Sequence, residues 1–351
     1  MSLTLISAAD LLNRLTEFDT IIDARTEAEF DEDRLPGAVN WPTLNNEERI
    51  LVGTMYKQIN QFEAKKRGAA MAARNIAAHI DREVIAKPKD WKPLAYCWRG
   101  GKRSGSLLLI LDQIGFKTTL VEGGYKAFRA AVVSDIPVQV ARLTFRVVCG
   151  TTGSGKTRLL HALAAQGAQV LDLEDLANHR SSVLGAIPGS PQPTQKRFDT
   201  LVWNALRNFD PTRTVFVESE SKKVGNVSIP VSLMERMRDS ACIDLDLPMA
   251  ERIELLMEDY DFFVQNSDFF CKRLDALTEA RGKVVVEGWK AQVLQGEVRS
   301  VVAELLTLHY DPVYLQSIER NFRQYGDATK VQAADRSTTS WRAIALALLQ
   351  D

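Results

Sequence analysis

The sequence predicts an α/β protein of two domains, and three features of its 351 residues lead to that prediction. Short apolar stretches alternate with segments of helical periodicity, which is typical of parallel sheets covered by helices. A cysteine after one stretch begins a glycine-rich basic turn, at residues 96–104. After another stretch, residues 150–157 read GTTGSGKT and fit the phosphate-binding pattern G-x-x-x-x-G-K-[ST]. We expect one anion-binding loop in each domain.

The N-terminal half supplies the elements of a first parallel sheet. We expect a helix to begin after Ser7, because its side chain is a suitable N-cap. Further on, we expect strands at residues 20–23, 94–96 and 118–121, and a helix at residues 104–113. Active groups of such folds lie at the carboxyl ends of strands, which is where Asp23 and Cys97 stand.

Residues 134–140 contain Pro137 and show little periodicity, so we place a domain boundary there. The first domain is then expected at residues 1–136 and the second at 137–351. In the second, a strand should begin at Leu143 and enter the phosphate loop. Further elements are expected at residues 156–165 (helix) and at 170–173, 215–218 and 242–245 (strands), with a mostly helical segment from Met249 onward.

Composition excludes several classes of protein. No apolar run approaches the roughly 20 residues that span a bilayer, and the N-terminus lacks the pattern of a secretory signal. We therefore expect a cytoplasmic protein without a membrane partner. The four cysteines have no C-x-x-C spacing and the histidines are scattered, so we expect neither disulfides nor a structural metal. The net charge of −1 argues against general nucleic-acid binding, and no DNA partner is expected.

The charge is nevertheless uneven along the chain. Residues 1–60 carry eleven acidic and five basic side chains, whereas residues 61–110 carry four acidic and eleven basic ones. The basic stretch includes Lys65, Lys66 and Arg67 and ends in the cysteine loop. Such a surface would attract a polyanion such as RNA, or it is a solvated face; charge alone leaves both interpretations open.

The cysteine loop has the composition of a reactive thiol site. The thiolate is the reactive form of cysteine, and nearby positive charge favours it. Arg99, Lys102 and Arg103 supply such charge, and the helix expected after the loop adds its positive end. We therefore predict that Cys97 is a catalytic nucleophile, assisted by these three cations.

The second loop predicts a diphosphate clamp. Its backbone N–H groups would bind a phosphate, Lys156 would neutralise it, and Thr157 would contact a magnesium ion if one is used. The expected ligand-binding residues are those of the motif, Gly150, Gly153, Ser154, Gly155, Lys156 and Thr157. Asp172 and Glu218, at strand ends, are the other candidate magnesium ligands. No purine-recognition motif is present, so the diphosphate need not belong to a nucleotide.

Several segments of the first half resemble rhodanese domains. They are residues 22–25 (IDAR), 29–30 (EF), 35–40 (LPGAVN) and 121–125 (VEGGY), together with the cysteine loop. Two departures stand out. Asp33 and Arg34 replace the usual Gly-His pair, and the C-x5-R spacing from Cys97 to Arg103 is one residue longer than in common sulfurtransferases. The longer loop resembles that of rhodanese-fold cell-cycle phosphatases, but Tyr96 stands where those have histidine.

As a whole, the chain resembles the bacterial tRNA 2-selenouridine synthase family. The resemblance covers both loops and four further segments, at residues 172–180, 192–196, 218–221 and 309–314. It implies an enzyme that converts 5-substituted 2-thiouridine at the tRNA wobble position to 2-selenouridine. Selenophosphate and geranyl diphosphate are the implied co-substrates, with an S-geranyl intermediate and no tightly bound cofactor.

The resemblance also implies roles for residues. The phosphate loop would bind geranyl diphosphate, and Cys97 would take part in selenium delivery, as a transient selenosulfide. The basic stretch would help to position the tRNA anticodon loop. The weak candidates for contact with tRNA are Trp98, Lys65, Lys66, Arg67, His179 and Arg180. An enzyme that produces selenophosphate is a further candidate partner.

Three other functions fit the same loops. A sulfurtransferase or C-x5-R phosphatase could be joined to an ATP-binding, kinase-like phosphate-loop domain. A non-enzymatic RNA-binding regulator would retain its function without Cys97.

Overall fold

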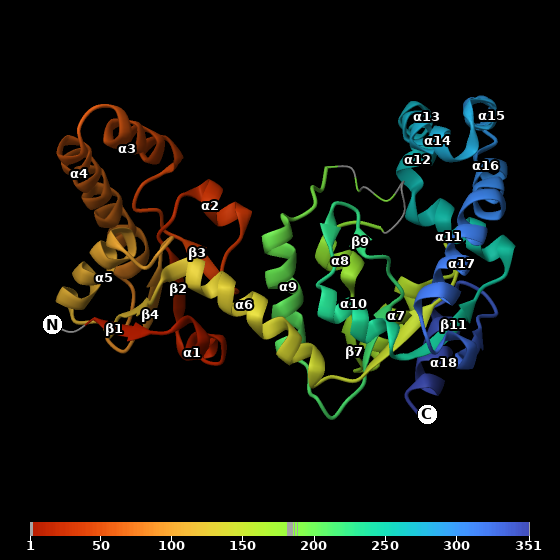
Figure 1. Cartoon of the computed structure of the whole chain (residues 1–351), viewed down its shortest axis with the longest axis horizontal. Helices are drawn as coiled ribbons and strands as arrows, with labels where there is room; N and C mark the ends of the chain where they lie inside the picture. The colour runs from red at the N-terminus through yellow and green to blue at the C-terminus, as the bar shows by residue number, and fades with distance from the viewer. Residues whose placement is uncertain (1–2, 181–184, 186, 188, 351) are drawn as a thin grey trace. The chain divides into compact units, whose positions relative to one another are not determined.

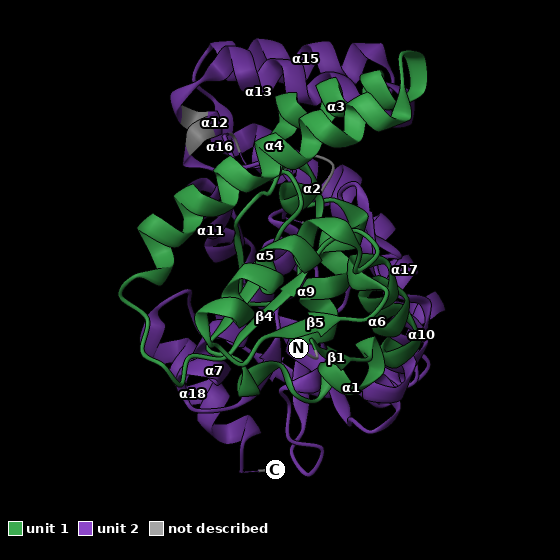
Figure 2. Ribbon diagram, turned by 90° about the vertical axis from the view of Figure 1, so that its left-hand side faces the viewer, with its two compact units in different colours: residues 1–136, 193–204 green, residues 137–192, 205–351 purple. Residues whose placement is uncertain are grey.

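The computed structural model describes residues 3–180, 185, 187 and 189–350. The chain forms two compact units, shown in Figures 1 and 2. The first contains residues 1–136 and 193–204, and the second contains residues 137–192 and 205–351.

The first unit is built on a five-stranded parallel sheet in the order β1-β5-β4-β2-β3. Its strands are β1 (Thr4–Ile6), β2 (Thr20–Asp23), β3 (Ala38–Asn40), β4 (Pro93–Tyr96) and β5 (Thr119–Val121). All four residues of β4 are buried, as expected of a central strand in a parallel sheet. The carboxyl ends of β2 and β4, which carry Asp23 and Tyr96, lie in register with each other.

Several helices of the first unit begin at side-chain caps that the sequence encodes. Ser7 caps α1 (Ala8–Leu12), as predicted, and Thr26 forms a capping box with Glu29 at the start of α2 (Glu27–Glu32). The remaining helical segments are η1 (Leu15–Glu17), α3 (Asn46–Gln58), α4 (Gln61–His79), η2 (Ile80–Val84), α5 (Lys102–Ile114) and α6 (Gly124–Ala141). The pair α3 and α4 forms a helical hairpin, visible in Figure 1.

The structure differs from the expected domain division in one segment. Residues 193–204, which the sequence placed in the second domain, belong to the first unit as the start of α9 (Gln195–Arg207). Buried contacts explain the difference: Thr200 donates a hydrogen bond to Asp33 at 3.0 Å, and the indole of Trp203 donates one to Asp135 at 2.8 Å. These partners are far away in sequence, so local pattern could not reveal them.

Residues 134–140, expected to be irregular, are helical. They form the end of α6, which continues through Pro137 to Ala141. A proline inside a helix costs one backbone hydrogen bond, which the buried Val132, Ile136 and Val140 offset by packing. The two compact units nevertheless divide between residues 136 and 137.

The second unit contains another five-stranded parallel sheet, in the order β12-β11-β6-β8-β7. Its strands are β6 (Phe145–Cys149), β7 (Gln169–Leu171), β8 (Val215–Glu218), β11 (Ala241–Asp246) and β12 (Thr329–Gln332). A short antiparallel pair is formed by β9 (Lys223–Val224) and β10 (Val227–Ser228). The predicted α/β class with parallel sheets is thus confirmed in both units.

Around this sheet lie α7 (Lys156–Ala165), α8 (Leu173–Ala177), α10 (Val231–Arg238) and α18 (Thr338–Leu348). The segment from Met249 is mostly helical, as predicted, but β12 is an exception because it pairs with β11 along the edge of the sheet. The helical segments are α11 (Met249–Asp259), α12 (Asp261–Gln265), α13 (Ser267–Leu274), η3 (Asp275–Leu277), α14 (Thr278–Arg281), α15 (Lys283–Leu294), α16 (Val298–Glu304), η4 (Leu305–Tyr310), α17 (Asp311–Asn321) and η5 (Tyr325–Asp327).

Among the described residues, no helix has the length and apolar character that crossing a membrane requires.

Candidate active sites

Cys97 directly follows β4 and begins the loop that leads into α5. Its side chain is buried, and its Sγ accepts a hydrogen bond from the backbone N–H of Gly101 at 3.2 Å. Gly101 is the N-cap of α5, so the sulfur lies at the positive end of a helix of 13 residues. This arrangement favours binding of an anion beside the sulfur.

Two glycines allow this loop to pack against the turn after β5. Gly124 has φ +59°, and a Cβ there would lie 2.2 Å from the carbonyl oxygen of Cys97. Gly100 has φ +62°, and a Cβ there would lie 2.5 Å from the carbonyl oxygen of Val121. The backbone N–H of Tyr125 donates to the Cys97 carbonyl at 2.8 Å. The VEGGY segment noted in the sequence therefore holds the cysteine loop in place through its backbone.

The cations expected around Cys97 occupy different environments. Arg99 and Lys102 are exposed. Arg103 is partly buried and donates hydrogen bonds from both terminal nitrogens to Glu29, at 2.6 and 3.2 Å. Its charge is therefore balanced by a carboxylate, and its evident role in this structure is to tie α5 to α2. Trp98 is partly buried and packs against the ring of Tyr125, with centroids 5.5 Å apart.

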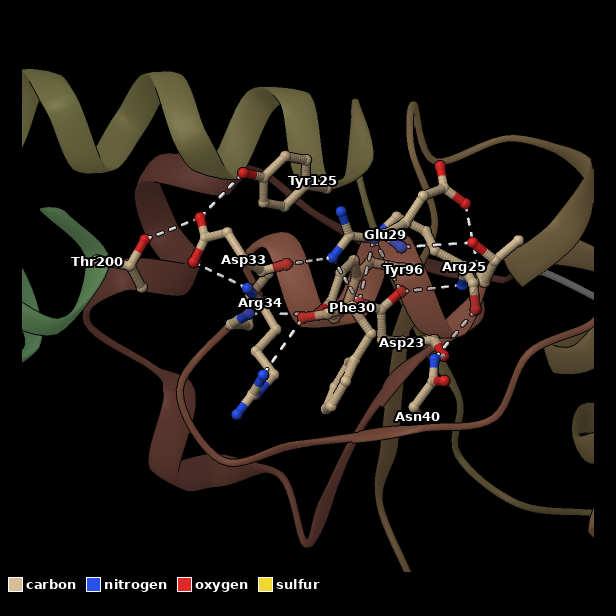
Figure 3. Close-up of polar contacts among 12 residues, drawn as sticks. Asp23, Arg25, Glu29, Phe30, Asp33, Arg34, Asn40, Tyr96, Tyr125 and Thr200 are labelled. Carbon is tan, nitrogen blue, oxygen red and sulfur yellow. Dashed lines mark hydrogen bonds and ion pairs between the residues drawn. The ribbon is translucent and has the colours of Figure 1, made fainter. Parts of the chain in front are cut away.

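Behind the loop, Asp23, Arg25 and Tyr96 form a buried polar network at the ends of β2 and β4 (Figure 3). Arg25 donates to both carboxylate oxygens of Asp23, and the hydroxyl of Tyr96 donates to Asp23 at 2.7 Å. Burial, and then the charge of Asp23, raise the pKa of Tyr96 well above its usual range, so this phenol stays protonated. Sequence reasoning identified Asp23 as a strand-end residue but did not predict this network.

Asp33, one of the two departures from the rhodanese pattern, is fully buried and forms the other end of the network. Its carboxylate accepts hydrogen bonds from Tyr125 at 2.9 Å and from Thr200 at 3.0 Å, as Figure 3 shows. Its backbone carbonyl accepts one from Arg25 at 2.6 Å. Burial outweighs these bonds and raises the pKa of Asp33. One acidic side chain thus joins α2, α6 and α9.

The basic residues Lys65, Lys66 and Arg67 are exposed on α4, a different element from the one that carries Cys97. Lys66 pairs with Glu63 at 2.6 Å, and its Nζ lies 5.2 Å from the centroid of the Phe62 ring. Phe62 is itself 66% exposed. This surface has the exposed cations and the aromatic ring that contact with RNA would use.

The phosphate loop lies between β6 and α7, as the motif predicts. Gly150, Gly153 and Gly155 have φ values of +153°, +75° and +86°, which favour glycine at each position. Ser154 is fully buried within the loop. The backbone is thereby shaped as a cradle that ends at the N-terminus of α7.

Lys156 bends back over this loop. Its Nζ donates to the carbonyl oxygens of Gly150 and Thr151 at 3.0 and 3.3 Å, and it lies 4.7 Å from the centroid of the Tyr314 ring. Burial disfavours the charged amine, but Tyr314 and three nearby carboxylates outweigh burial and raise the pKa of Lys156. The side chain is therefore protonated at neutral pH and places a positive charge beside the phosphate loop.

Three carboxylates converge beside Thr157. Ligand oxygens of Glu174, Glu218 and Glu220 lie within 4.8 Å of one another, and the Thr157 hydroxyl lies 3.4 and 3.5 Å from Glu174 and Glu218. Burial, and then the charges of the other two glutamates, raise the pKa of Glu218 well above its usual range. Asp172, the other magnesium candidate, instead caps α8 and contacts His161 at 3.1 Å.

Arg252 of α11 also binds the backbone of the phosphate loop. It donates two hydrogen bonds to the carbonyl of Thr152 in the phosphate loop, at 3.0 and 2.7 Å. It also forms a bidentate ion pair with Asp311 at the start of α17. No sequence motif identifies Arg252. The one indirect indication was that its partner Asp311 lies in segment 309–314, which the sequence analysis had singled out.

These elements line an open cavity of about 590 Å³. Its lining includes the phosphate loop, the three glutamates, His179, Arg180, and residues from α11, η4 and α17. Burial and the charge of Arg273 lower the pKa of His179, so its imidazole is neutral at physiological pH. Arg180 lies with its guanidinium carbon 4.8 Å from the centroid of the Tyr260 ring. The structure thus brings His179 and Arg180 to the same cavity as the phosphate loop.

The fold and the two sites define a rhodanese-like unit with a cysteine loop, joined to a phosphate-loop unit. Family models agree: the rhodanese-like domain matches residues 7–131, and the tRNA 2-selenouridine synthase AAA domain matches residues 143–283. A tRNA 2-selenouridine synthase of Nitrosomonas eutropha is 33% identical, over 89% of this chain and 92% of that protein. The chain therefore belongs to the tRNA 2-selenouridine synthase family.

Two further similarities were found. A tRNA 2-selenouridine synthase of Nitrosomonas europaea is 39% identical, over 72% of this chain and 66% of that protein. The solved structure of a rhodanese-related protein from Thermoplasma volcanium is 19% identical, over 36% of this chain and 89% of that chain, with a TM-score of 0.24.

Proposed function

We propose that this tRNA-modifying transferase replaces the 2-sulfur of a 5-substituted 2-thiouridine at the tRNA wobble position with selenium. The donor is selenophosphate, and the reaction passes through S-geranyl-2-thiouridine made from geranyl diphosphate. The observation that carries the proposal is that one chain holds both a diphosphate loop with a buried cation and a cysteine at an anion-binding helix end. Each loop serves one of the two half-reactions.

In the first half-reaction, the thiouridine sulfur attacks C1 of geranyl diphosphate. A carbon–sulfur bond forms, the carbon–oxygen bond to the diphosphate breaks, and pyrophosphate leaves with the electron pair. Lys156 and the N–H groups at the start of α7 stabilise the negative charge that develops on the departing pyrophosphate. Alkylation turns the sulfur into a better leaving group for the second half-reaction.

The acidic cluster fits a magnesium ion. Carboxylate and hydroxyl oxygens are the ligands that this cation prefers, and Thr157, Glu174, Glu218 and Glu220 provide them. Glu218 is 1% exposed, and its Oε1 accepts no hydrogen bond from the described residues, so the cluster has an oxygen suited to a cation. A bound Mg²⁺ would supply positive charge to the diphosphate.

In the second half-reaction, selenium displaces the alkylated sulfur. A carbon–selenium bond forms at C2, the carbon–sulfur bond breaks, and geranyl thiolate leaves. A selenosulfide on Cys97 would require an oxidant, because the selenium of selenophosphate is already at the level of selenide. Attack of the Cys97 thiolate on phosphorus needs none: a sulfur–phosphorus bond forms and selenide leaves phosphorus with the electron pair. Water then hydrolyses the phosphocysteine.

The tRNA anticodon loop is the proposed macromolecular partner, with Lys65, Lys66 and Arg67 of α4 as its contacts in the first unit. A tRNA substrate implies a cytoplasmic site of action. An enzyme that makes selenophosphate is the partner that would supply the second half-reaction.

Nucleoside mass spectrometry of tRNA tests the proposal. Cells that lack this protein should lose both 2-selenouridine and S-geranyl-2-thiouridine while retaining 2-thiouridine. An unchanged nucleoside profile would favour the alternatives, which are a phosphatase, a sulfurtransferase joined to an ATP-binding unit, and a non-enzymatic RNA-binding regulator. Release of phosphate from simple esters and tight binding of ATP would then identify which of them applies.

A further inference from the structure

We propose that the phosphate-loop cavity contains a subsite for the hydrocarbon chain of the prenyl donor, formed by Leu256, Tyr260, Tyr310, Val313 and Tyr314. We call these five residues the apolar wall. The inference rests on the proposed function and extends it, because it assigns the binding of the chain, as opposed to its diphosphate, to particular side chains.

The apolar wall faces the same cavity as the phosphate loop. All five residues line it together with Gly153, Gly155, Lys156 and Thr157. They come from three elements of the second unit: α11 with its C-cap Tyr260, the end of η4, and the first turn of α17. The volume of about 590 Å³ lies in the range of roughly 300–1,000 Å³ that small-molecule pockets occupy.

The wall begins directly at the phosphate loop. A Cβ added to Gly153 would lie 3.0 Å from Cγ and Cδ1 of Leu256, so the leucine packs on the loop backbone. On the other side, the Tyr314 ring lies 4.7 Å from Nζ of Lys156. A hydrocarbon attached to a diphosphate held by Lys156 would therefore meet apolar surface from its first carbons onward.

One polar group of the wall, the hydroxyl of Tyr314, is engaged outside the cavity surface. The hydroxyl of Tyr314 donates to the backbone carbonyl of Ser219 at 2.7 Å, which leaves its ring as the available surface. Tyr260 stacks on Phe263, with ring centroids 5.7 Å apart. Val313 is 56% exposed, although it lies at a cavity where a ligand could cover it. An apolar chain would remove this surface from water, which is favourable.

The position of the wall is fixed relative to the loop by a buried cation. Arg252 binds the Thr152 carbonyl and Asp311 at once, so α11 and the start of α17 are tied to the phosphate loop. Because the wall belongs to these two helices and the residues that adjoin them, the distance between the diphosphate and chain subsites is set by the fold.

Calorimetric binding of three probes to the full-length protein tests the subsite. The probes are inorganic pyrophosphate, dimethylallyl diphosphate and geranyl diphosphate, which share the diphosphate group and carry no, one or two isoprene units. The wild-type protein should bind geranyl diphosphate at least about tenfold more tightly than pyrophosphate, with dimethylallyl diphosphate between them, because each added isoprene unit buries more apolar area.

The variant Val313→Asn introduces a polar, uncharged side chain at an exposed position, so folding is not at risk. It should weaken geranyl diphosphate binding by about fivefold and leave pyrophosphate binding within about twofold. Val284→Asn is the matched control, since Val284 is 87% exposed on α15 and does not line the cavity. This control should bind all three probes as the wild-type protein does.

Two negative outcomes are distinguishable. If the wild-type protein binds the three probes equally, the prenyl donor itself is wrong and the subsite is overturned with the proposed function. If the wild-type protein prefers geranyl diphosphate and Val313→Asn retains the full preference, the donor stands and the chain lies elsewhere.

Discussion

Arg252 and Asp311 join α11 to α17 through a bidentate ion pair, with N–O distances of 2.9 and 2.6 Å. The same guanidinium holds the carbonyl of Thr152 in the phosphate loop. One buried side chain thus connects the phosphate loop to two helices of the C-terminal segment.

Replacement of Arg252 by alanine should destabilise the protein by about 3 kcal/mol, because it leaves a carboxylate and a loop carbonyl without their partner. Thermal unfolding should show a lower Tm, and geranyl diphosphate should bind at least about tenfold more weakly. Arg299→Ala is the control: Arg299 pairs with Glu254 on the surface and is 66% exposed, so its loss should cost less than about 1 kcal/mol. Equal effects of the two variants would refute the role of Arg252.

Replacement of Lys156 by alanine should abolish geranylation. The loop backbone would remain, but the cation that neutralises the diphosphate would be gone. Titration with inorganic pyrophosphate should show affinity at least about tenfold lower, and mass spectrometry should detect no S-geranyl nucleoside. Normal geranyl transfer by this variant would show that the loop does not bind the donor.

Replacement of Gly124 by alanine should impair selenation and spare geranylation. The added Cβ would collide with the Cys97 carbonyl and the Gly100 nitrogen, so the cysteine loop must move. Gly115→Ala is the matched control, because Gly115 also has a positive φ but no atom lies within 4 Å of its added Cβ. If both variants lose selenation to the same extent, backbone strain alone explains the effect.

Stability should depend on pH through Asp33. Its pKa is raised in the folded protein, so protonated Asp33 contributes stability that is fully present below the unfolded pKa of about 4. This contribution is lost as the pH rises through the folded pKa. The free energy of unfolding of Asp33→Asn, relative to wild type, should therefore increase between pH 4 and the folded pKa of Asp33. Asp31→Asn, an exposed change in the same segment, is the control; parallel profiles for Asp33→Asn and wild type would contradict the account.

Regular elements were predictable from the sequence because their signals are local. The spans 20–23 and 215–218 are strands with the predicted bounds, and α7 occupies the predicted residues 156–165. The phosphate loop was predictable because its glycines stand at fixed short spacings in the sequence, and these are the positions where the backbone needs a positive φ. The helical hairpin of α3 and α4 was not predicted, although Asn45 caps α3 through a capping box with Glu48.

Features that depend on distant partners were not predictable. The edge strand β12 lies in a helical context and is recognisable only by its pairing with β11. The burial of Asp33 depends on Thr200, which is 167 positions further along the chain. Likewise, the sequence identified Thr157 and Glu218 as candidate magnesium ligands, but not Glu174 and Glu220, which complete the acidic cluster. The ion pair between Arg103 and Glu29 was also not predictable, because it forms only where α5 and α2 meet in the fold.

The central claim is that one chain carries out two half-reactions at two loops, and the Cys97→Ala variant tests it most directly. The purified variant is given thiolated tRNA, geranyl diphosphate and selenophosphate, and the nucleosides are analysed by mass spectrometry. The account predicts that S-geranyl-2-thiouridine accumulates and that no 2-selenouridine forms. Formation of 2-selenouridine at the wild-type rate would contradict it.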